Sequence, residues 1–252
     1  MPESRRMATR GARILVTGGT SGYGRALAME FAGRGAEVMV VGRDAERLAS
    51  AQGAGLAAVR ADLTVPADRR TVLEAVRDRF GGLDAVVHSA AVQTPIDLVT
   101  DTPQNARHLI EREIDADLIA PLAFTVEALP LLGQGQGGRV VFVTSTLAFA
   151  PKRSAPAYCA AKAGLTAFAL SLRSQLRNDA PRLRSAVVTL PLVDTPMTEG
   201  RAQRTMPAPE AARRTVRALE RGAEDIDIGV ARVFRLLHRI VPRTAMRITR
   251  DS

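Results

Sequence analysis

The chain has 252 residues, of which 46% are hydrophobic and 24% are charged, an ordinary composition for a globular protein. This length suits one α/β domain with a large core, and no apolar stretch reaches the roughly eighteen residues that a membrane span requires. The formal net charge of +9 comes mainly from arginine, without a helix-turn-helix, zinc finger or aromatic-lined basic strand. We therefore expect no nucleic-acid partner, and anionic small molecules such as a phosphorylated cofactor are better suited to this charge.

The single cysteine, Cys159, cannot form a disulfide within the chain, which favours a location in the reducing cytoplasm. Residues 1–11 are charged but are not followed by the apolar segment of a secretory signal, so we predict a flexible arm there. No repeat or linker divides the rest of the sequence. We predict a single domain over residues 1–252 and no metal site.

Short apolar segments rich in β-branched residues predict strands at 12–17, 36–41, 56–61, 83–88, 139–145 and 183–190. Helical patterns lie between them, near 23–34, 44–51, 66–80, 103–132 and 156–180. The strands lack clear alternation, which indicates burial on both faces, as in a parallel sheet. Repeated β–α units of this kind predict a Rossmann-like, doubly wound α/β fold with six strands and helices on both faces.

A glycine-rich turn, T-G-G-T-S-G-Y-G over residues 17–24, stands between the first strand and the first helix. Gly18 permits a tight turn, and Gly22 and Gly24 allow the backbone to approach a pyrophosphate and the helix to pack on the sheet. The N-terminus of the helix adds partial positive charge for phosphates. The pattern predicts a nucleotide site; the alternative is a glycine-rich turn without a ligand.

The second strand ends in V-V-G-R at residues 40–43, where a cofactor without a ribose phosphate usually meets an acidic side chain. Gly42 offers no carboxylate, and Arg43 could bind a 2′-phosphate, which favours NADP(H). Alternatively, Arg43 only begins the next helix on the surface. Asp62 ends the third strand and is expected either to accept a hydrogen bond from the adenine amino group or to cap the following turn.

Ser145, Tyr158 and Lys162 form the most specific pattern in the chain, with spacings of thirteen and four residues. Ser145 ends a strand at the edge where open α/β sheets bind ligands, and Tyr158 and Lys162 share one helix face. A phenol titrates near pH 10 unaided, and a nearby ammonium stabilises its phenolate form. The three residues therefore predict a proton-transferring site.

With its glycine turn and Tyr-x-x-x-Lys pair, the sequence resembles the short-chain dehydrogenase/reductase family from about Arg13 to Met197. The resemblance implies that Tyr158 is the general acid or base, that Ser145 binds the substrate carbonyl, and that Lys162 lowers the tyrosine pKa. It also implies a homodimer through the helices at 103–132 and 156–180. The cofactor-binding residues that it implies are Gly18, Thr20, Ser21, Gly22, Tyr23, Gly24, Arg43, Asp62, Leu63, Ser89, Ala90, Tyr158, Lys162, Pro191, Val193 and Thr195.

Three segments depart from the family pattern. The usual Asn-Asn-Ala-Gly reads His88-Ser-Ala-Ala91, where we expect His88 to fill a packing site rather than act as a base. Asp117 stands where the family has the asparagine of the proton relay, so we predict a working relay with altered pH dependence. The usual Pro-Gly reads Pro191-Leu192, and Leu192 is expected to reshape the pocket floor.

The C-terminal region, 222–252, is predicted to be an atypical basic helical segment without the seventh strand of the family. Residues 230–250 hold six arginines and no acid, and Pro242 is expected to break or kink the helix. Its apolar face is expected to pack on the domain; the alternative is contact with an anionic membrane surface or an acidic partner. The absent strand removes one family route to tetramers and favours a dimer.

Together these patterns predict an NADP(H)-dependent oxidoreductase that interconverts a ketone or aldehyde and an alcohol. The substrate is expected to be a small molecule. By their positions in loops, the apolar candidates for the wall of its pocket are Leu98, Val99, Leu147, Phe149, Leu192 and Met197. The alternative is a nucleotide-binding scaffold or regulator with impaired turnover, which the departures at His88, Asp117 and Leu192 motivate. A serine hydrolase is a poor fit, because no motif places a histidine to activate Ser145.

Overall fold

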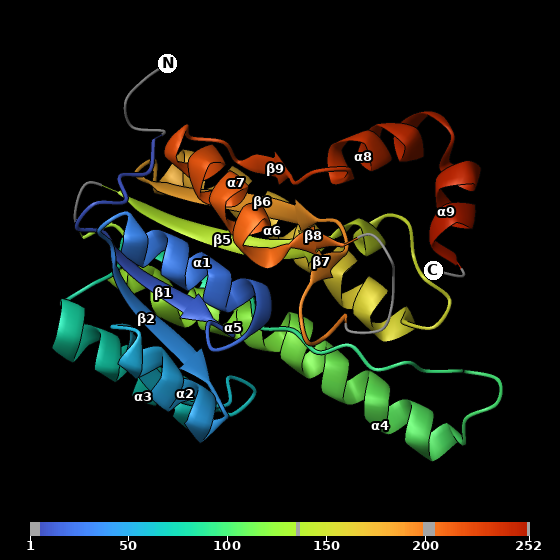
Figure 1. The fold of residues 1–252 in the computed structure, drawn as a ribbon, viewed down its shortest axis with the longest axis horizontal. Helices are drawn as coiled ribbons and strands as arrows, with labels where there is room; N and C mark the ends of the chain where they lie inside the picture. The colour runs from blue at the N-terminus through green and yellow to red at the C-terminus, as the bar shows by residue number, and fades with distance from the viewer. Residues whose placement is uncertain (1–5, 135–136, 199–204, 251–252) are drawn as a thin grey trace.

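The computed structural model describes residues 6–134, 137–198 and 205–250. It contains a seven-stranded sheet with the order β3-β2-β1-β4-β5-β6-β9, in which every neighbouring pair is parallel (Figure 1). The strands are β1 Arg13–Thr17, β2 Glu37–Gly42, β3 Ala57–Arg60, β4 Ala85–His88, β5 Gly138–Ser145, β6 Leu183–Leu190 and β9 Asp225–Asp227. The predicted doubly wound α/β fold is confirmed.

Helices cover both faces of this sheet. One face carries α1 (Gly22–Gly33), α2 (Ala45–Gly53) and α7 (Ala208–Glu220), which pack on alternate strand residues such as Ile14 and Val16. The other face carries α3 (Pro66–Phe80), α5 (Ala120–Ala128) and α6 (Pro156–Asp179), packed on Leu15 and Phe142. Because both faces are covered, the central strands are apolar throughout, which is why their sequences show no alternation.

The predicted absence of a seventh strand is wrong, since β9 pairs in parallel with β6 from Val187 to Thr189. This strand has three residues, Asp225–Asp227, and only its central Ile226 is buried. A single apolar residue between two acids carries no strand pattern, so only the pairing with β6 defines the element. The argument that a missing strand favours a dimer over a tetramer therefore fails.

The long helix expected over 103–132 is interrupted near its middle. It consists of α4 (Pro103–Ile114), the π-helical turn η2 (Asp115–Ile119), α5 and the short 3-10 turn η3 (Leu129–Leu131). In η2 the N–H of Ala120 bonds the carbonyl of Asp115, five residues back. Pro121 follows at once and has no N–H to donate to Asp117, its partner in a regular α-helix. The predicted relay position, Asp117, thus lies in the π turn.

Both ends of the described chain depart from expectation. Of the arm at 1–11, residues 1–5 lie outside the described part, but Met7 is buried and the Thr9 hydroxyl donates to Glu220 at 2.8 Å. At the other end, α8 (Ala231–Ile240) and α9 (Pro242–Arg250) meet at Pro242, as predicted. The expected packing of α8 on the domain holds only in part: Phe234 packs on the Phe149 ring, whereas Val233, Leu236 and Ile240 are exposed.

Candidate active site

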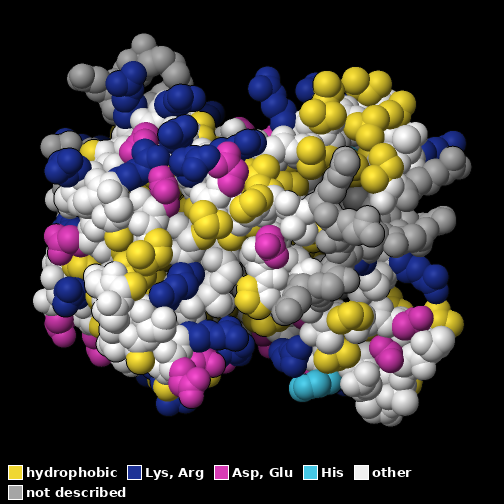
Figure 2. All heavy atoms as spheres, in the orientation of Figure 1, with side chains coloured by type: hydrophobic (Ala, Val, Ile, Leu, Met, Phe, Trp, Pro, Cys, Tyr) yellow, Lys and Arg dark blue, Asp and Glu magenta, His cyan; other side chains and the backbone are white. Residues whose placement is uncertain are grey.

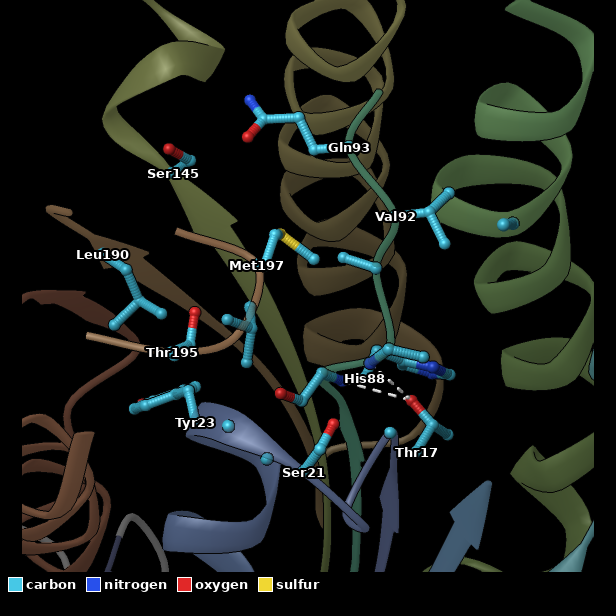
Figure 3. Close-up of a pocket in the computed structure, with 18 of the residues that line it drawn as sticks. Thr17, Ser21, Tyr23, His88, Val92, Gln93, Ser145, Leu190, Thr195 and Met197 are labelled. Carbon is cyan, nitrogen blue, oxygen red and sulfur yellow. Dashed lines mark hydrogen bonds between the residues drawn. The ribbon is translucent and has the colours of Figure 1, made fainter. Parts of the chain in front are cut away.

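A cavity of about 1150 Å³ opens at the carboxyl ends of the parallel strands. The register places Thr17 at the end of β1 beside Val41 of β2 and His88 of β4, while Ser145 of β5 pairs with Leu190 of β6. Loops after these strands and the start of α1 complete the wall (Figure 3). The cavity is large enough for a dinucleotide and a small substrate together, since drug-sized ligand sites span roughly 300–1,000 Å³.

The N-terminus of α1 opens into this cavity. Its N-cap, Ser21, makes no side-chain capping bond, and the first turn holds no acidic residue. The first backbone N–H groups of a helix have no partner within the helix, so these donors and the helix dipole suit a phosphate. The residues present therefore fit the pyrophosphate of a dinucleotide cofactor.

The glycines of this turn are required by close packing. Gly18 has φ of +65°, and a Cβ there would lie 2.6 Å from the Cα of Ala90. At Gly24 a Cβ would lie 2.3 Å from the carbonyl oxygen of Gly18. Any side chain at either position would push the first strand, the first helix and the loop after β4 apart.

One end of the cavity places an arginine, Arg43, next to a glycine, Gly42. A Cβ at Gly42 would lie 2.6 Å from the Thr20 hydroxyl, so a longer side chain there would have to displace the Thr20 side chain. Arg43 is 66% exposed and its Nη1 lies 3.2 Å from the Asp62 carboxylate, which also accepts from Thr64. This end therefore lacks the acid at position 42 and presents a guanidinium held by Asp62.

The loop after β4 is held by the Thr17 hydroxyl, which accepts hydrogen bonds from the N–H groups of Ser89 and Ala90 (Figure 3). Beside it, His88 is buried and stacks on Phe142 with ring centroids 5.1 Å apart. The Thr125 hydroxyl donates its only proton to Pro121, so the Nε2 atom of His88, 2.9 Å away, must be the donor to Thr125. Burial, and then the Lys162 charge, lower the pKa of His88 to about 3. A neutral, packed His88 agrees with the expected packing role.

Ser145, Tyr158 and Lys162 come together at the inner end of the cavity. Ser145 hydrogen-bonds the Tyr158 phenol, and the Lys162 ammonium lies 5.4 Å from the centroid of the Tyr158 ring. Burial raises the pKa of the Tyr158 phenol above its usual value, and the nearby Asp117 charge raises it further, while the Ser145 hydrogen bond lowers it. The surroundings favour the protonated phenol, which is the form that donates a proton.

Asp117 lies behind Lys162 and does not reach the cavity wall. It is fully buried, with Oδ2 3.4 Å from the Lys162 ammonium and Oδ1 accepting from the N–H of Val92 at 2.8 Å. Burial raises the pKa of Asp117 to about 6, against the lowering effects of Lys162 and the Val92 hydrogen bond; the Glu113 charge adds to the rise. The Asp117 carboxyl therefore changes its charge near pH 6, and this changes the electrostatic environment of the Lys162 ammonium.

Glu113 is a buried acid that sequence reasoning missed. It precedes Asp117 by four residues and accepts a hydrogen bond from the N–H of Thr94, while Asp117 accepts from Val92. Alternate N–H groups of an extended segment point to the same side. The N–H groups of Val92 and Thr94 therefore both face the helix that carries the two acids. Gln93, between them, lines the cavity, and Figure 3 shows it near Ser145. A charged residue in a helix gives no signal of such burial.

The loop after β6 closes the nicotinamide side. Thr195 faces the start of α1, since a Cβ at Gly22 would lie 3.2 Å from the Thr195 Cβ. The N–H and hydroxyl of Thr195 also hydrogen-bond the Thr198 hydroxyl, which donates to the Val193 carbonyl. These contacts fix the segment from Val193 to Thr198 against the glycine turn.

The structure gathers the predicted residues at this one cavity, with Asp117 set behind it. Tyr23 lines it, but its hydroxyl bonds Thr215 at 2.7 Å, which leaves its backbone for a ligand. Of the candidates for the substrate wall, Leu98 and Val99 lie on an exposed loop away from the cavity, and Phe149 is set back from its wall. The predicted residues that line the cavity are Gly18, Thr20, Ser21, Gly22, Tyr23, Gly24, Arg43, Asp62, Leu63, Ser89, Ala90, Ser145, Leu147, Tyr158, Lys162, Pro191, Leu192, Val193, Thr195 and Met197.

Further lining residues came from tertiary packing alone. They lie on the loop after β4, before α6 and in the C-terminal helices: Gln93, Lys152, Val230, Phe234 and Ile248. Phe234 and His238 of α8 pack on the Phe149 ring at centroid distances of 6.1 and 5.3 Å. No local sequence pattern connects residues 149, 234 and 248.

Comparison with known proteins places the chain among oxidoreductases of this architecture. Its sequence is 33% identical to an uncharacterized oxidoreductase of Staphylococcus epidermidis over 189 residues, 74% of this chain and 80% of the relative. It is also 33% identical to a 1-deoxy-11-beta-hydroxypentalenate dehydrogenase of Streptomyces exfoliatus over 194 residues, 74% of this chain and 69% of that one.

Solved structures share the fold. A short-chain dehydrogenase of Burkholderia cenocepacia in complex with NADP superposes with a TM-score of 0.84 at 22% identity, covering 96% of this chain and 99% of that one. A 3-ketoacyl-(acyl-carrier-protein) reductase of Brucella melitensis complexed with NADH gives a TM-score of 0.77 at 23% identity, with coverages of 87% and 97%. The family profile described as short chain dehydrogenase matches residues 12–205. The chain belongs to the short-chain dehydrogenase/reductase family of oxidoreductases.

Proposed function

We propose that the protein is an NADP(H)-dependent oxidoreductase that interconverts a ketone or aldehyde and an alcohol, with Tyr158 as general acid and base. The observation that carries this proposal is the Ser145–Tyr158–Lys162 group at the end of a cavity of about 1150 Å³ with a helix N-terminus in its wall. When bound, the nicotinamide cofactor supplies or accepts the hydride at the carbonyl carbon.

The chain's own residues handle the oxygen and its proton. Ser145 donates a hydrogen bond to the carbonyl oxygen and orients it, while Tyr158 transfers its phenolic proton to that oxygen during reduction. Lys162 then lies near the phenolate and stabilises it until a proton returns. In the oxidative direction the same groups act in reverse.

The preference for NADP(H) rests on the adenosine end. Gly42, packed against Thr20, supplies no carboxylate for a ribose 2′-hydroxyl, and Arg43 offers a guanidinium to a 2′-phosphate. Relatives of this fold have been crystallised with either cofactor, so this preference depends on the residues of this chain.

Fluorescence titration of the purified protein with NADPH and NADH tests the proposal. Tight NADPH binding with much weaker NADH binding is the expected result, and binding of neither would refute the oxidoreductase assignment. A carbonyl-substrate screen follows, with Tyr158→Phe as control: its activity should fall by on the order of 10²-fold or more while its NADPH affinity stays near that of the parent.

A catalytically impaired nucleotide-binding protein is the second candidate, and the buried Asp117 beside Lys162 is the observation that favours it. An acid here raises the pKa of Tyr158 and makes its deprotonation harder. This candidate predicts NADPH binding without turnover of any carbonyl substrate and a Tyr158→Phe variant that keeps its biological role.

We further propose the cytoplasm as compartment, on the single unpaired Cys159.

A further inference from the structure

The outer face of α8 carries an apolar ridge that the described residues of the domain leave exposed. Its residues are Val233, Leu236 and Ile240, whose exposed fractions are 69%, 58% and 68%. Their spacing of three and four residues places them on one side of the helix. Figure 2 shows hydrophobic side chains gathered over the part of the surface where Figure 1 places α8.

The opposite face of α8 fixes the helix so that this ridge points outward. Ala231 is buried, and Phe234 and His238 pack on Phe149. Arg235 donates to both carboxylate oxygens of Asp227, at 2.8 and 2.7 Å, and to the Thr189 hydroxyl at 2.6 Å. Rotating the ridge inward would break these contacts, so the domain cannot cover it with α8 in this position.

Cationic side chains border the ridge on one side. Arg232, Arg239 and Arg243 are exposed, and residues 228–250 include no aspartate or glutamate. At 100° per residue, Arg232 and Arg239 lie about 75–95° from the centre of the ridge, along the same border. Val241 and Met246 extend the exposed apolar surface along the junction and α9.

We propose that α8 and α9 dock on an anionic lipid surface. The ridge residues enter the boundary between headgroups and acyl chains, and the flanking arginines bind lipid phosphates, the arrangement of an interfacial amphipathic helix. Residues 228–250 carry arginines and no acids. Their charge therefore complements a negative bilayer better than it complements a second copy of this net-positive chain. In the described part of the chain, no helix is long and apolar enough to cross a membrane, so the contact lies in the plane of the surface.

Docking in this orientation brings the lipid surface beside the mouth of the cavity. Phe234 of α8, Val230 just before it and Ile248 of α9 line that cavity from the other side of the same helices. Given the proposed function, the substrate class is an apolar carbonyl compound or alcohol dissolved in the bilayer.

The test is co-sedimentation of the full-length protein with vesicles of phosphatidylcholine alone and of phosphatidylcholine with phosphatidylglycerol, at low and moderate salt. Binding that needs phosphatidylglycerol and weakens with salt is expected. The double variant Arg232→Gln/Arg239→Gln should bind on the order of tenfold more weakly. The triple variant Val233→Gln/Leu236→Gln/Ile240→Gln should lose binding even at low salt.

Matched controls keep the charge and apolar changes comparable. Arg70→Gln/Arg77→Gln removes two exposed arginines from α3, and Val99→Gln removes an apolar side chain that is 91% exposed on another loop. Both controls should bind vesicles like the parent. All variants should keep NADPH affinity, which reports an intact fold independently of turnover.

Two outcomes would overturn the proposal. One is vesicle binding that is absent, or equal in the parent and the triple variant. The other is a triple variant that sediments as a smaller species than the parent while its vesicle binding is unchanged. That result would assign the ridge to a protein interface. Failure of the proposed function would show separately, as a lack of turnover in protein that still binds anionic vesicles.

Discussion

Asp117 places a titrating carboxyl 3.4 Å from the ammonium of Lys162, which belongs to the proposed catalytic group. With a pKa raised to about 6, mainly by burial, this carboxyl is neutral in mild acid and charged at neutral pH. The charged form stabilises the Lys162 ammonium and makes the Tyr158 phenolate less favourable. We predict an inflection near pH 6 in kcat that Asp117→Asn removes, and an unchanged profile in that variant would contradict a role for Asp117.

The same pKa fixes the sign of a stability effect. A carboxyl whose pKa is raised in the folded state favours folding fully only below its unfolded pKa, and that contribution is lost as pH rises through about 6. Asp117→Asn should therefore gain stability relative to the parent as pH rises through about 6, and the two proteins should be closer in stability at pH 4. Thermal unfolding at both pH values measures the difference.

The proposed preference for NADP(H) depends on Arg43, at the other end of the cavity. We predict that Arg43→Ala weakens NADPH binding by on the order of tenfold or more, because a charge-assisted contact with the 2′-phosphate is lost, and leaves NADH binding nearly unchanged. Parallel fluorescence titrations measure both affinities. Arg70→Ala on α3 is the matched control, and equal loss of both cofactors in Arg43→Ala would contradict the assignment.

At the scale of elements, α4 and η2 hold the loop that presents Gln93 through Glu113 and Asp117. Glu113→Ala leaves the partly buried N–H of Thr94 without its acceptor, which costs on the order of 1 kcal/mol, and we predict a several-fold higher KM with a smaller change in kcat. Glu113→Gln keeps an acceptor but removes the charge that raises the Asp117 pKa. Its KM should stay near the parent value, while the inflection of its kcat profile moves to lower pH.

A shared loss of stability without these separate kinetic changes would reduce Glu113 to a packing residue. The contrast between the two variants is the informative measurement, since only the glutamine preserves the loop while changing the electrostatics.

Elements with their own local pattern could be predicted from the sequence, and those defined by distant partners could not. The strand ending in Ser145 and the helix holding Tyr158 and Lys162 are continuous apolar and helical segments. By contrast, β9 has one buried residue and exists through its bonds to β6. The π turn at Asp117 has the composition of the helix around it, and only Pro121 hints at the break.

For the site, the predicted residues sit at chain positions that the fold always brings to the carboxyl edge of its sheet. The additional wall residues Phe234 and Ile248 come from helices after the last strand, where no rule of the fold fixes their direction. Glu113 was missed for a further reason: helical charges are normally exposed, and only the extended segment at Val92–Thr94 explains its burial.

At the scale of the whole molecule, we propose a homodimer through the face of η2, α5 and α6. Ile119, Val126 and Leu170 are exposed there, on elements that the family resemblance assigns to the dimer. Val126→Glu or Leu170→Glu should shift the protein toward monomer, because a charge in an apolar interface is not compensated. Sedimentation velocity measures this, with Val99→Glu as the control at an exposed valine elsewhere; a parent that is already monomeric would contradict the dimer.

The strand β9 has a consequence for how the molecule behaves at high concentration. It is an end strand of the sheet, paired with β6 alone, and such strands are templates for adding a strand from another chain. Both of its aspartates are occupied: Asp225 binds Arg173 at 2.8 Å and Asp227 binds Arg235 at 2.7 Å. A three-residue edge bordered by ion pairs offers a neighbouring chain little backbone to pair with, which resists the growth of continuous sheets between molecules.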